Sequence, residues 1–294
     1  MLLLACDGTD RSGVRHSMYY WSTTFKLSGK EKTFLRSNRV GRLYLRYFDL
    51  VVDDNGNVSP NATIDFVDTL PSGMEVVPTV FIVNDCMRQS THGLADKLLR
   101  RILQMNETND IRNVKEIQID CDWTRQTEHN YFAFLRDLRA LSAKKRITLS
   151  TTIRLHQLSG NVPPVDRGVL MMYNTGDVTR LNVRKPILDI NDVMPYLRQI
   201  HSYRLPLSTA YSLFSWRVLF RRQEFLGILH SSDEYPVIPG DSIVVRTSEL
   251  DEIYKAKAAV NHYRRDANTE IILFDLSDHN INRFTLKEYE KIYH

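Results

Sequence analysis

Cysteine and long apolar runs are scarce in this sequence of 294 residues. Its three cysteines, Cys6, Cys86 and Cys121, are too few for a disulfide framework, and no Cys-x-x-Cys or His/Cys cluster has the spacing of a zinc site. No apolar run approaches the roughly 20 residues that a membrane-spanning helix needs. Internal repeats and low-complexity tracts are also absent. These absences argue against a disulfide-stabilised scaffold, a zinc domain and a membrane-spanning protein.

Charge of one sign is not concentrated in any long run. The formal net charge is +4, and Lys and Arg are scattered apart from short runs such as Lys144-Lys145-Arg146. That run falls where a helix is expected to lead into a strand, which is typical of a solvated turn, so we expect no nucleic-acid partner. The hydrophobic fraction of 43% is ordinary for a protein with a sizeable core. The length suits one large α/β domain as well as two smaller domains.

The N-terminal residues have a pattern of their own. Leu3-Leu4-Ala5-Cys6 resembles the bacterial lipobox, in which the cysteine is lipidated, and the polar residues that follow suit a flexible tether. Residues 1–14 are therefore interpreted as a lipobox remnant and tether, with a start codon placed too late. This predicts a membrane anchor at Cys6 in the bacterial cell envelope. The alternative is a free cysteine behind a chance run of leucines.

Strand-like and helix-like segments alternate along the rest of the chain. Apolar, β-branched and aromatic runs predict eight strands at 17–25, 42–52, 75–84, 116–124, 146–155, 168–174, 205–216 and 269–277. Apolar stripes of helical period lie in 94–103, 131–141, 193–200 and 253–263, and a capping-box pattern, Thr285-x-x-Glu288, opens a last helix. We predict a single (β/α)8 barrel domain over 15–294. An open doubly wound sheet is the alternative, but no glycine-rich phosphate loop follows the first strand.

Three details of this barrel are less regular. Residues 53–74 are polar and rich in turn residues, so no helix is expected there. Residues 217–247 are predicted to form an insertion after the seventh strand, with a hairpin within 235–247. The helix over 249–264 is expected to follow an N-terminal cap at Ser248.

The fourth predicted strand brings two acids to one face. Gln118, Asp120 and Asp122 alternate with apolar residues and would face into the barrel, with Asp122 nearest the mouth, where active sites of such barrels lie. Two carboxylates sharing a low-dielectric site would have pKa values that differ, so one could hold the proton that acid catalysis needs. The alternative is that both acids form ion pairs with inward Arg46 or Arg154.

Two short motifs resemble the chitinase-like glycoside hydrolases. Gln118-x-Asp120-x-Asp122 resembles the Asp-x-Asp-x-Glu of that family, and Met171-Met172-Tyr173-Asn174, two strands later, is similar to its Met-x-Tyr-Asp. The resemblance implies that Asp122 is the acid, that Asp120 orients an acetamido group of the substrate, and that Tyr173 and Asn174 assist. Asp122 is one methylene shorter than Glu, which moves the proton donor by about 1 Å.

Further side chains are predicted at the mouth because they lie at or just past strand ends. They are Trp21, Trp123, Arg154, Tyr211, Phe214, Trp216 and Asp275. Aromatic faces at such positions commonly stack on sugar rings, although each aromatic alone also suits a core.

The sequence therefore predicts a monomeric protein that binds carbohydrate, as a retaining glycoside hydrolase without a cofactor or metal, and substrate assistance is one course open to it. A non-catalytic surface receptor for glycans is the alternative. A metal-dependent hydrolase using acids and histidines such as Asp85 and His156 is a weaker one.

Overall fold

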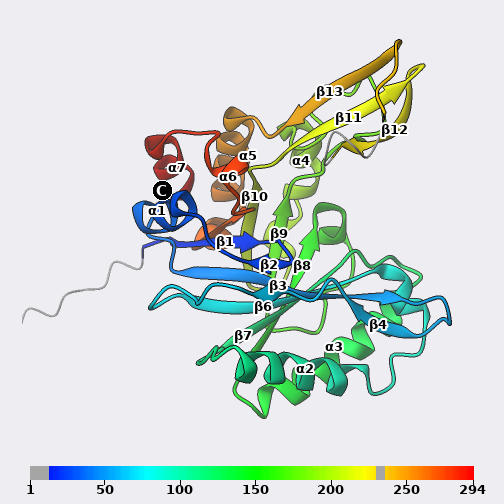
Figure 1. Ribbon diagram of the computed structural model, residues 1–294, viewed down its shortest axis with the longest axis vertical. Coiled ribbons are helices and arrows are strands. Elements are labelled where there is room, and N and C mark those ends of the chain that lie inside the picture. Colours follow the sequence, from blue (N-terminus) through cyan, green and yellow to red (C-terminus); the bar gives the residue numbers. More distant parts are fainter. Residues whose placement is uncertain (1–12, 230–235) are drawn as a thin grey trace, which may run out of the picture.

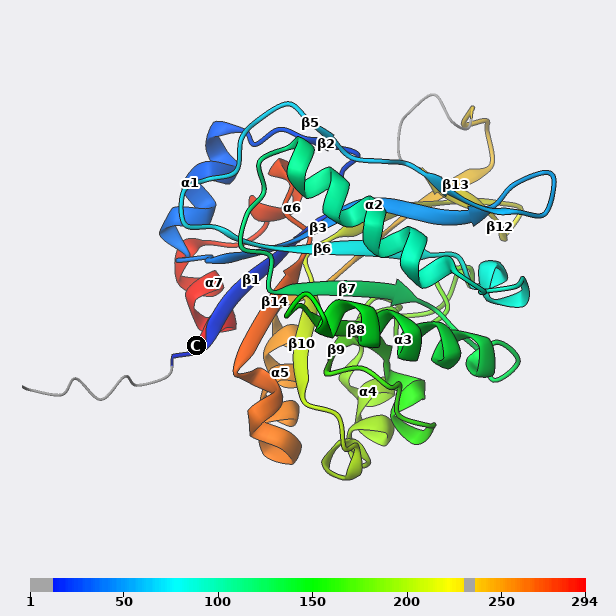
Figure 2. The same cartoon turned by 90° about the horizontal axis from the view of Figure 1, so that it is seen from below.

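The computed structural model describes residues 13–229 and 236–294. Eight parallel strands form its centre: β1 (Arg15–Tyr20), β3 (Arg42–Val52), β6 (Glu75–Ile82), β7 (Glu116–Cys121), β8 (Thr148–Arg154), β9 (Arg167–Met172), β10 (Leu207–Ser212) and β14 (Glu270–Phe274). Each strand pairs with its neighbours in chain order, and β1 pairs with both β3 and β14, which closes the sheet into a barrel (Figures 1 and 2). The (β/α)8 prediction and all eight strand positions are confirmed.

Helices surround the barrel. They are α1 (Gly29–Ser37), α2 (Leu94–Thr108), α3 (Glu128–Ala143), α4 (Ile190–Leu197), α5 (Leu250–Arg264), α6 (Asp278–Ile281) and α7 (Leu286–Tyr293), with short 3-10 turns η1 (Asn84–Arg88), η2 (Leu155–Ser159), η3 (Ile200–Ser202) and η4 (Arg265–Asn268). The predicted apolar stripes face the sheet; α3, for example, buries Tyr131, Phe134, Leu135 and Leu138. Between β8 and β9 only η2 is present.

The link between β3 and β6 contains no helix, as predicted. It forms β4 (Val58–Asn61), which pairs antiparallel with β3, and β5 (Asp65–Phe66), which pairs with β2 (Thr24–Phe25). Pro60 and Pro71 lack a backbone donor, and Gly56 and Gly73 adopt positive φ, so this segment turns repeatedly instead of coiling.

The insertion after β10 is larger than the predicted hairpin. Three antiparallel strands, β11 (Ser215–Arg221), β12 (Glu224–Leu229) and β13 (Asp241–Thr247), form a sheet in the order β12-β11-β13. The β11–β12 hairpin lies N-terminal to the segment predicted as a hairpin, because residues 215–221 form a strand of their own after β10 ends at Ser212. Figure 1 shows this insertion sheet projecting from the end of the barrel at which the strands finish.

The two expected helix caps have different outcomes. The capping box of α7 is confirmed, since Thr285 Oγ1 accepts from the Glu288 N–H and the Glu288 carboxylate accepts from the Thr285 N–H. The Ser248 cap of α5 is wrong. The residue before α5 is Glu249, without a side-chain cap, because the Ser248 hydroxyl is hydrogen-bonded to Ser212.

Charged side chains fill the barrel interior at the end where the strands begin. Nη1 of Arg42 lies 3.0 Å from Glu116 Oε2 and 3.4 Å from Glu270 Oε1, and Arg167 contacts the same two carboxylates. We call these four residues the barrel-floor ion cluster. Burial alone would raise the pKa of Glu270, but the guanidinium groups of Arg167 and Arg42 outweigh burial and the pKa is lowered. No pattern in the sequence predicted this cluster.

Candidate functional site

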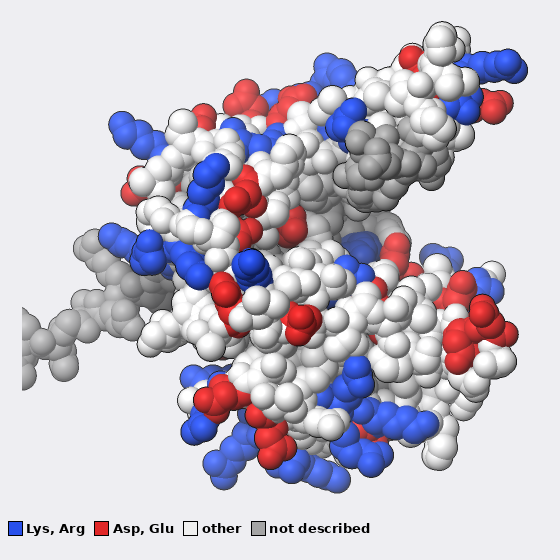
Figure 3. Space-filling view, in the orientation of Figure 1, with Lys and Arg blue, Asp and Glu red and all other residues white. Residues whose placement is uncertain are grey.

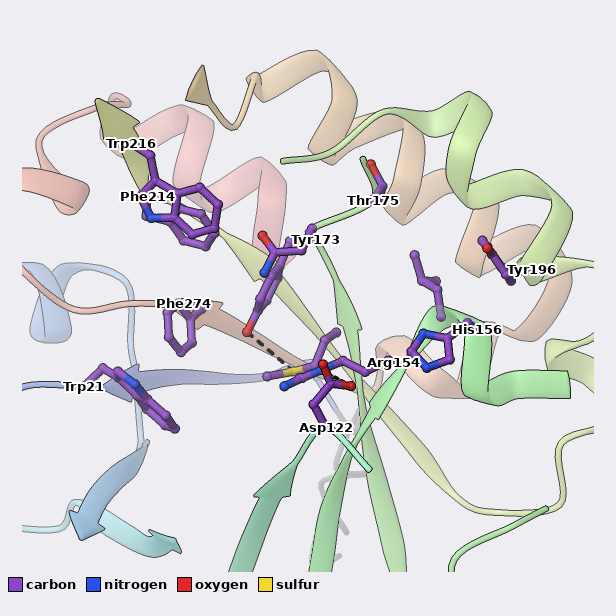
Figure 4. Close-up of a pocket in the computed structure, with 13 residues that line it drawn as sticks. Trp21, Asp122, Arg154, His156, Tyr173, Thr175, Tyr196, Phe214, Trp216 and Phe274 are labelled. Carbon is purple, nitrogen blue, oxygen red and sulfur yellow. Dashed lines mark hydrogen bonds and ion pairs between the residues drawn. The ribbon is translucent and has the colours of Figure 1, made fainter. Parts of the chain in front are cut away.

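A cavity of about 350 Å³ opens at the mouth of the barrel, where the strands end (Figure 4). Its wall is built by side chains that follow or end several strands, together with Tyr196 of α4 and Trp216 of β11. The insertion sheet stands beside it, and Figure 3 shows the surface hollowed between that sheet and the rest of the mouth. The position agrees with the rule that ligands of parallel barrels bind at the carboxyl ends of the strands.

The two acids of β7 differ in environment. Asp120 is 4% exposed, and its Oδ1 accepts from Thr152 Oγ1 at 2.6 Å and from Arg154 Nη2 at 3.1 Å. The Asp122 side chain is 64% exposed on the cavity wall, and its Oδ1 lies 3.8 Å from Arg154 Nε. The two carboxylates therefore do not share one buried site, and Arg154 contacts both, as the ion-pair alternative expected. Arg46 pairs with Asp49 instead.

Gln118 lies below the cavity. It is fully buried; its Oε1 accepts from Tyr19 Oη at 2.7 Å, and its Nε2 lies 3.5 Å from Ser150 Oγ. It faces inward as predicted, but it is not among the residues that line the cavity. An interior of eight strands is just wide enough for side chains to fill, and Tyr19 and Tyr44 occupy this level.

Tyr173 presents a hydroxyl with little to bind. In the described part of the chain its hydrogen bond is to Met171 Sδ at 3.7 Å, a weak acceptor (Figure 4). Burial raises the pKa of Tyr173, although the nearby Arg154 acts in the opposite direction, so the phenol stays neutral and able to donate. Asn174, next in the chain, is exposed on the cavity wall with a φ of 56°.

An aromatic wall faces these polar groups. Trp216 stacks on Phe214 with ring centroids 4.8 Å apart, and Trp21 lies 5.3 Å from Phe274. Figure 4 shows these four rings on one side of the cavity, with Asp122, Arg154 and His156 on the other. The arrangement gives apolar faces for stacking opposite groups that can bind hydroxyl and carbonyl oxygens.

Three residues that were predicted at the mouth face the helices and not the cavity. Trp123 is 4% exposed and packs against Tyr131 and Phe132 of α3, and Tyr211 is fully buried with its hydroxyl donating to Asn268 Oδ1 at 3.1 Å. The Asp275 carboxylate accepts from Asn280 of α6, and burial raises its pKa to about 6. Adjacent residues of a strand face opposite sides. Since Asp122, Ala210 and Phe274 face inward, the neighbours that follow them lie against the helices, and these predictions are wrong.

Some cavity residues were not predicted. Phe274 follows from the alternation of β14, because it lies two residues after the inward Ile272. Thr175 and Tyr196 come from the long link after β9 and from α4, whose approach to the mouth has no signal in the sequence.

Residues 13–229 and 236–294 contain neither a cluster of potential metal ligands nor a helix suited to crossing a bilayer. Within these ranges no group of three or more His, Cys, Asp or Glu side chains is placed to hold a metal ion. No helix there is both long enough and apolar enough to cross a bilayer. Cys86 and Cys121 are buried and unpaired thiols, whereas Cys6 lies outside the described residues.

No family model matches the sequence, and no curated protein matches it. Solved structures do match. A chitinase from Chromobacterium violaceum aligns over 95% of this chain and 99% of its own, with a TM-score of 0.63 and 12% identity. The spore cortex-lytic enzyme SleL of Bacillus cereus aligns over 95% of this chain and 74% of its own, with a TM-score of 0.60 and 16% identity.

A third match is a mutant GH18 chitinase from Cycas revoluta in complex with (GlcNAc)4, which aligns over 95% of this chain and 100% of its own, with a TM-score of 0.58 and 10% identity. The fold is that of the chitinase-like glycoside hydrolases. The resemblance that the two short motifs indicated thus extends over nearly the whole chain as a fold.

Proposed function

We propose that the protein binds a glycan chain in the mouth cavity and hydrolyses its glycosidic bonds with Asp122 as the proton donor. The observation that carries this proposal is that, among the described residues that line the cavity, Asp122 is the one carboxylate, and that it faces a wall of four aromatic rings. An exposed acid opposite aromatic rings on which sugar rings can stack is placed to protonate the leaving oxygen of a bound glycan.

The rest of the site favours a substrate-assisted course. Asp120 is buried and held by Thr152 and Arg154, so it is not placed to attack the sugar. The acetamido oxygen of the substrate would bond to the anomeric carbon as the bond to the leaving oxygen breaks and Asp122 supplies its proton. Water then opens this intermediate and returns a proton to Asp122, which retains the configuration. The hydroxyl of Tyr173, which donates to the weak acceptor Met171 Sδ, would donate to the acetamido group instead when substrate is bound.

The second candidate is a glycan receptor without turnover. One contact favours it: Arg154 approaches the carboxylates of both Asp120 and Asp122, so the acid that would have to donate the proton has an arginine beside it. A hydrolysis screen over chitin-type, bacterial cell-wall and host glycans, run beside a binding assay on the same panel, separates the two candidates. Turnover of any bound glycan supports the hydrolase, and tight binding without cleavage supports the receptor.

Replacing Trp216 by Ala tests the stacking wall. We expect glycan affinity to fall by about 3- to 10-fold, which corresponds to the worth of one aromatic contact. Phe225→Ala is the matched control, because Phe225 is an exposed aromatic residue of the same insertion sheet that does not line the cavity. Calorimetric titration of both variants measures the effect. Equal glycan affinity of the two variants would show that Trp216 does not contribute to glycan binding.

We also propose that the chain is lipid-anchored at Cys6 in the bacterial cell envelope. The support is the Leu3-Leu4-Ala5-Cys6 motif followed by polar residues. Expressed in a bacterium from its full reading frame, the protein is expected to partition into the detergent phase, and Cys6→Ser is expected to move it into the aqueous phase. Unlipidated protein from the unmodified frame would contradict the anchor.

A further inference from the structure

The end of the barrel opposite the cavity carries exposed cations at the starts of five strands. No ion pair joins any of them to an acid within the described ranges. They are Arg39, Lys115, Lys144, Lys145, Arg146, Arg204 and Arg265, and they are exposed in the segments that lead into β3, β7, β8, β10 and β14. Because the eight strands are parallel and close on themselves, these segments surround one end of the molecule. We call this set the basic rim.

Acids at the same end do little to neutralise the rim. Most of them are already engaged by other cations: Asp110 by Arg112 at 2.7 Å, Asp166 by Arg139 at 2.7 Å, Asp266 by Arg264 at 3.4 Å and Glu75 by Arg42 at 2.6 Å. Glu107 and Glu290 are exposed near this end without an ion pair to a described residue. The seven cations of the rim therefore leave a net positive surface.

The mouth end is different, since its loops carry both signs. Asp53, Asp54, Asp177, Asp189 and Asp192 accompany Arg125, Arg180 and Arg184 in the segments that follow β3, β7 and β9. The positive charge is thus polarised along the barrel axis, toward the end away from the cavity.

The chain enters the barrel at this basic end. β1 begins at Arg15, at the edge of the molecule from which the strands run toward the insertion sheet (Figure 1). Cys6 lies a short stretch before it, and a chain of that length spans at most about 30 Å. An anchor at Cys6 would therefore hold the rim, and not the cavity, close to the membrane.

We infer that the basic rim docks on the anionic headgroups of a lipid membrane, so that the cavity faces away from the bilayer. Cations at the starts of five strands around one end of the barrel suit an extended anionic surface, which attracts each Lys or Arg that lies near it. One lipid chain alone binds membranes only marginally, and a basic patch is the kind of second signal that stabilises the attachment. Docking of the rim does not depend on whether the mouth cavity binds or hydrolyses a glycan.

The test uses the full chain with Cys6→Ser, so that the lipid is absent, and co-sedimentation with phosphatidylcholine vesicles with or without phosphatidylglycerol. We expect binding only with phosphatidylglycerol, and weakening by added salt. Lys115→Gln, Lys144→Gln and Lys145→Gln together are expected to reduce affinity by about 10- to 100-fold. The matched control, Arg125→Gln, Arg180→Gln and Arg184→Gln, removes the same charge at the mouth end and is expected to leave vesicle affinity unchanged.

Three results would overturn the inference: binding that does not depend on phosphatidylglycerol, equal loss of affinity in both triple variants, or tight binding to duplex DNA without binding to anionic vesicles. The last would assign the rim to a nucleic acid instead. Circular dichroism of both triple variants establishes that they are folded, and all six positions are exposed, which makes a folding defect a minor concern.

Discussion

Asp122→Asn is expected to lower the rate of glycan hydrolysis by about 10²- to 10⁴-fold, the usual contribution of a general acid, while glycan affinity changes little. The amide keeps the size and the hydrogen-bonding reach of the carboxyl group but has no acidic proton to transfer to the leaving oxygen. Steady-state turnover of a glycan that the screen identifies, together with calorimetric titration of the same glycan, measures both effects.

Two further variants sharpen this test. Asp85→Asn is the matched control, because Asp85 is similarly exposed, follows a barrel strand and pairs with an arginine, Arg88, yet does not line the cavity; it is expected to leave turnover unchanged. Asp122→Glu extends the acid by one methylene toward the reach of the acid in the resembled family, and it is expected to retain or raise turnover. A protein that binds glycans tightly but cleaves none of them would refute the hydrolase and support the receptor.

Arg42→Met is expected to lower the free energy of unfolding by about 3–5 kcal/mol. Arg42 is the shared partner of Glu116 and Glu270, which are both buried, and its removal leaves two carboxylates with only Arg167 between them. Breaking a buried ion pair in this way is costly because the remaining charge has lost its compensation. Denaturant unfolding followed by far-UV circular dichroism measures the change.

Matched variants identify the cause of this loss. Arg204→Met removes an exposed arginine from the same end of the barrel and is expected to change stability by less than about 0.5 kcal/mol. Glu270→Gln added to Arg42→Met is expected to recover part of the loss, since it removes one of the stranded charges. An equally large decrease in the free energy of unfolding in Arg204→Met, or no decrease in Arg42→Met, would show that the barrel-floor ion cluster does not stabilise the fold.

The same cluster predicts a loss of stability in acid. The pKa of Glu270 is lower in the folded protein than its ordinary value of 4.5, so the unfolded chain binds the proton more tightly. Its stabilising contribution is therefore complete above that ordinary value and disappears as the pH falls through the lowered one. In Arg42→Met this part of the acid dependence is expected to become smaller, which urea titrations at a series of pH values would show.

Several features could be predicted from the sequence by itself because they depend on local periodicity. Continuous apolar runs identified all eight strands, and stripes of helical period identified α2, α3, α4 and α5 but not α1 or α6. Alternation placed Gln118 and Asp120 inside the barrel, and turn residues between 53 and 74 excluded a helix there. These properties arise from neighbours in the chain, so a linear pattern records them.

Only the tertiary structure decided which of these residues meet in the cavity. The contact of Arg154 with both acids, the burial of Gln118 beneath the mouth and the barrel-floor ion cluster depend on strands far apart in the chain that barrel closure brings together. Trp123, Tyr211 and Asp275 were misplaced because a position at a strand end does not state which face a side chain takes. Whether a side chain at a strand end faces the interior or the helices depends on how far that strand extends along the axis of the closed barrel. The interior has room for one of two adjacent side chains, and the other must pack against a helix.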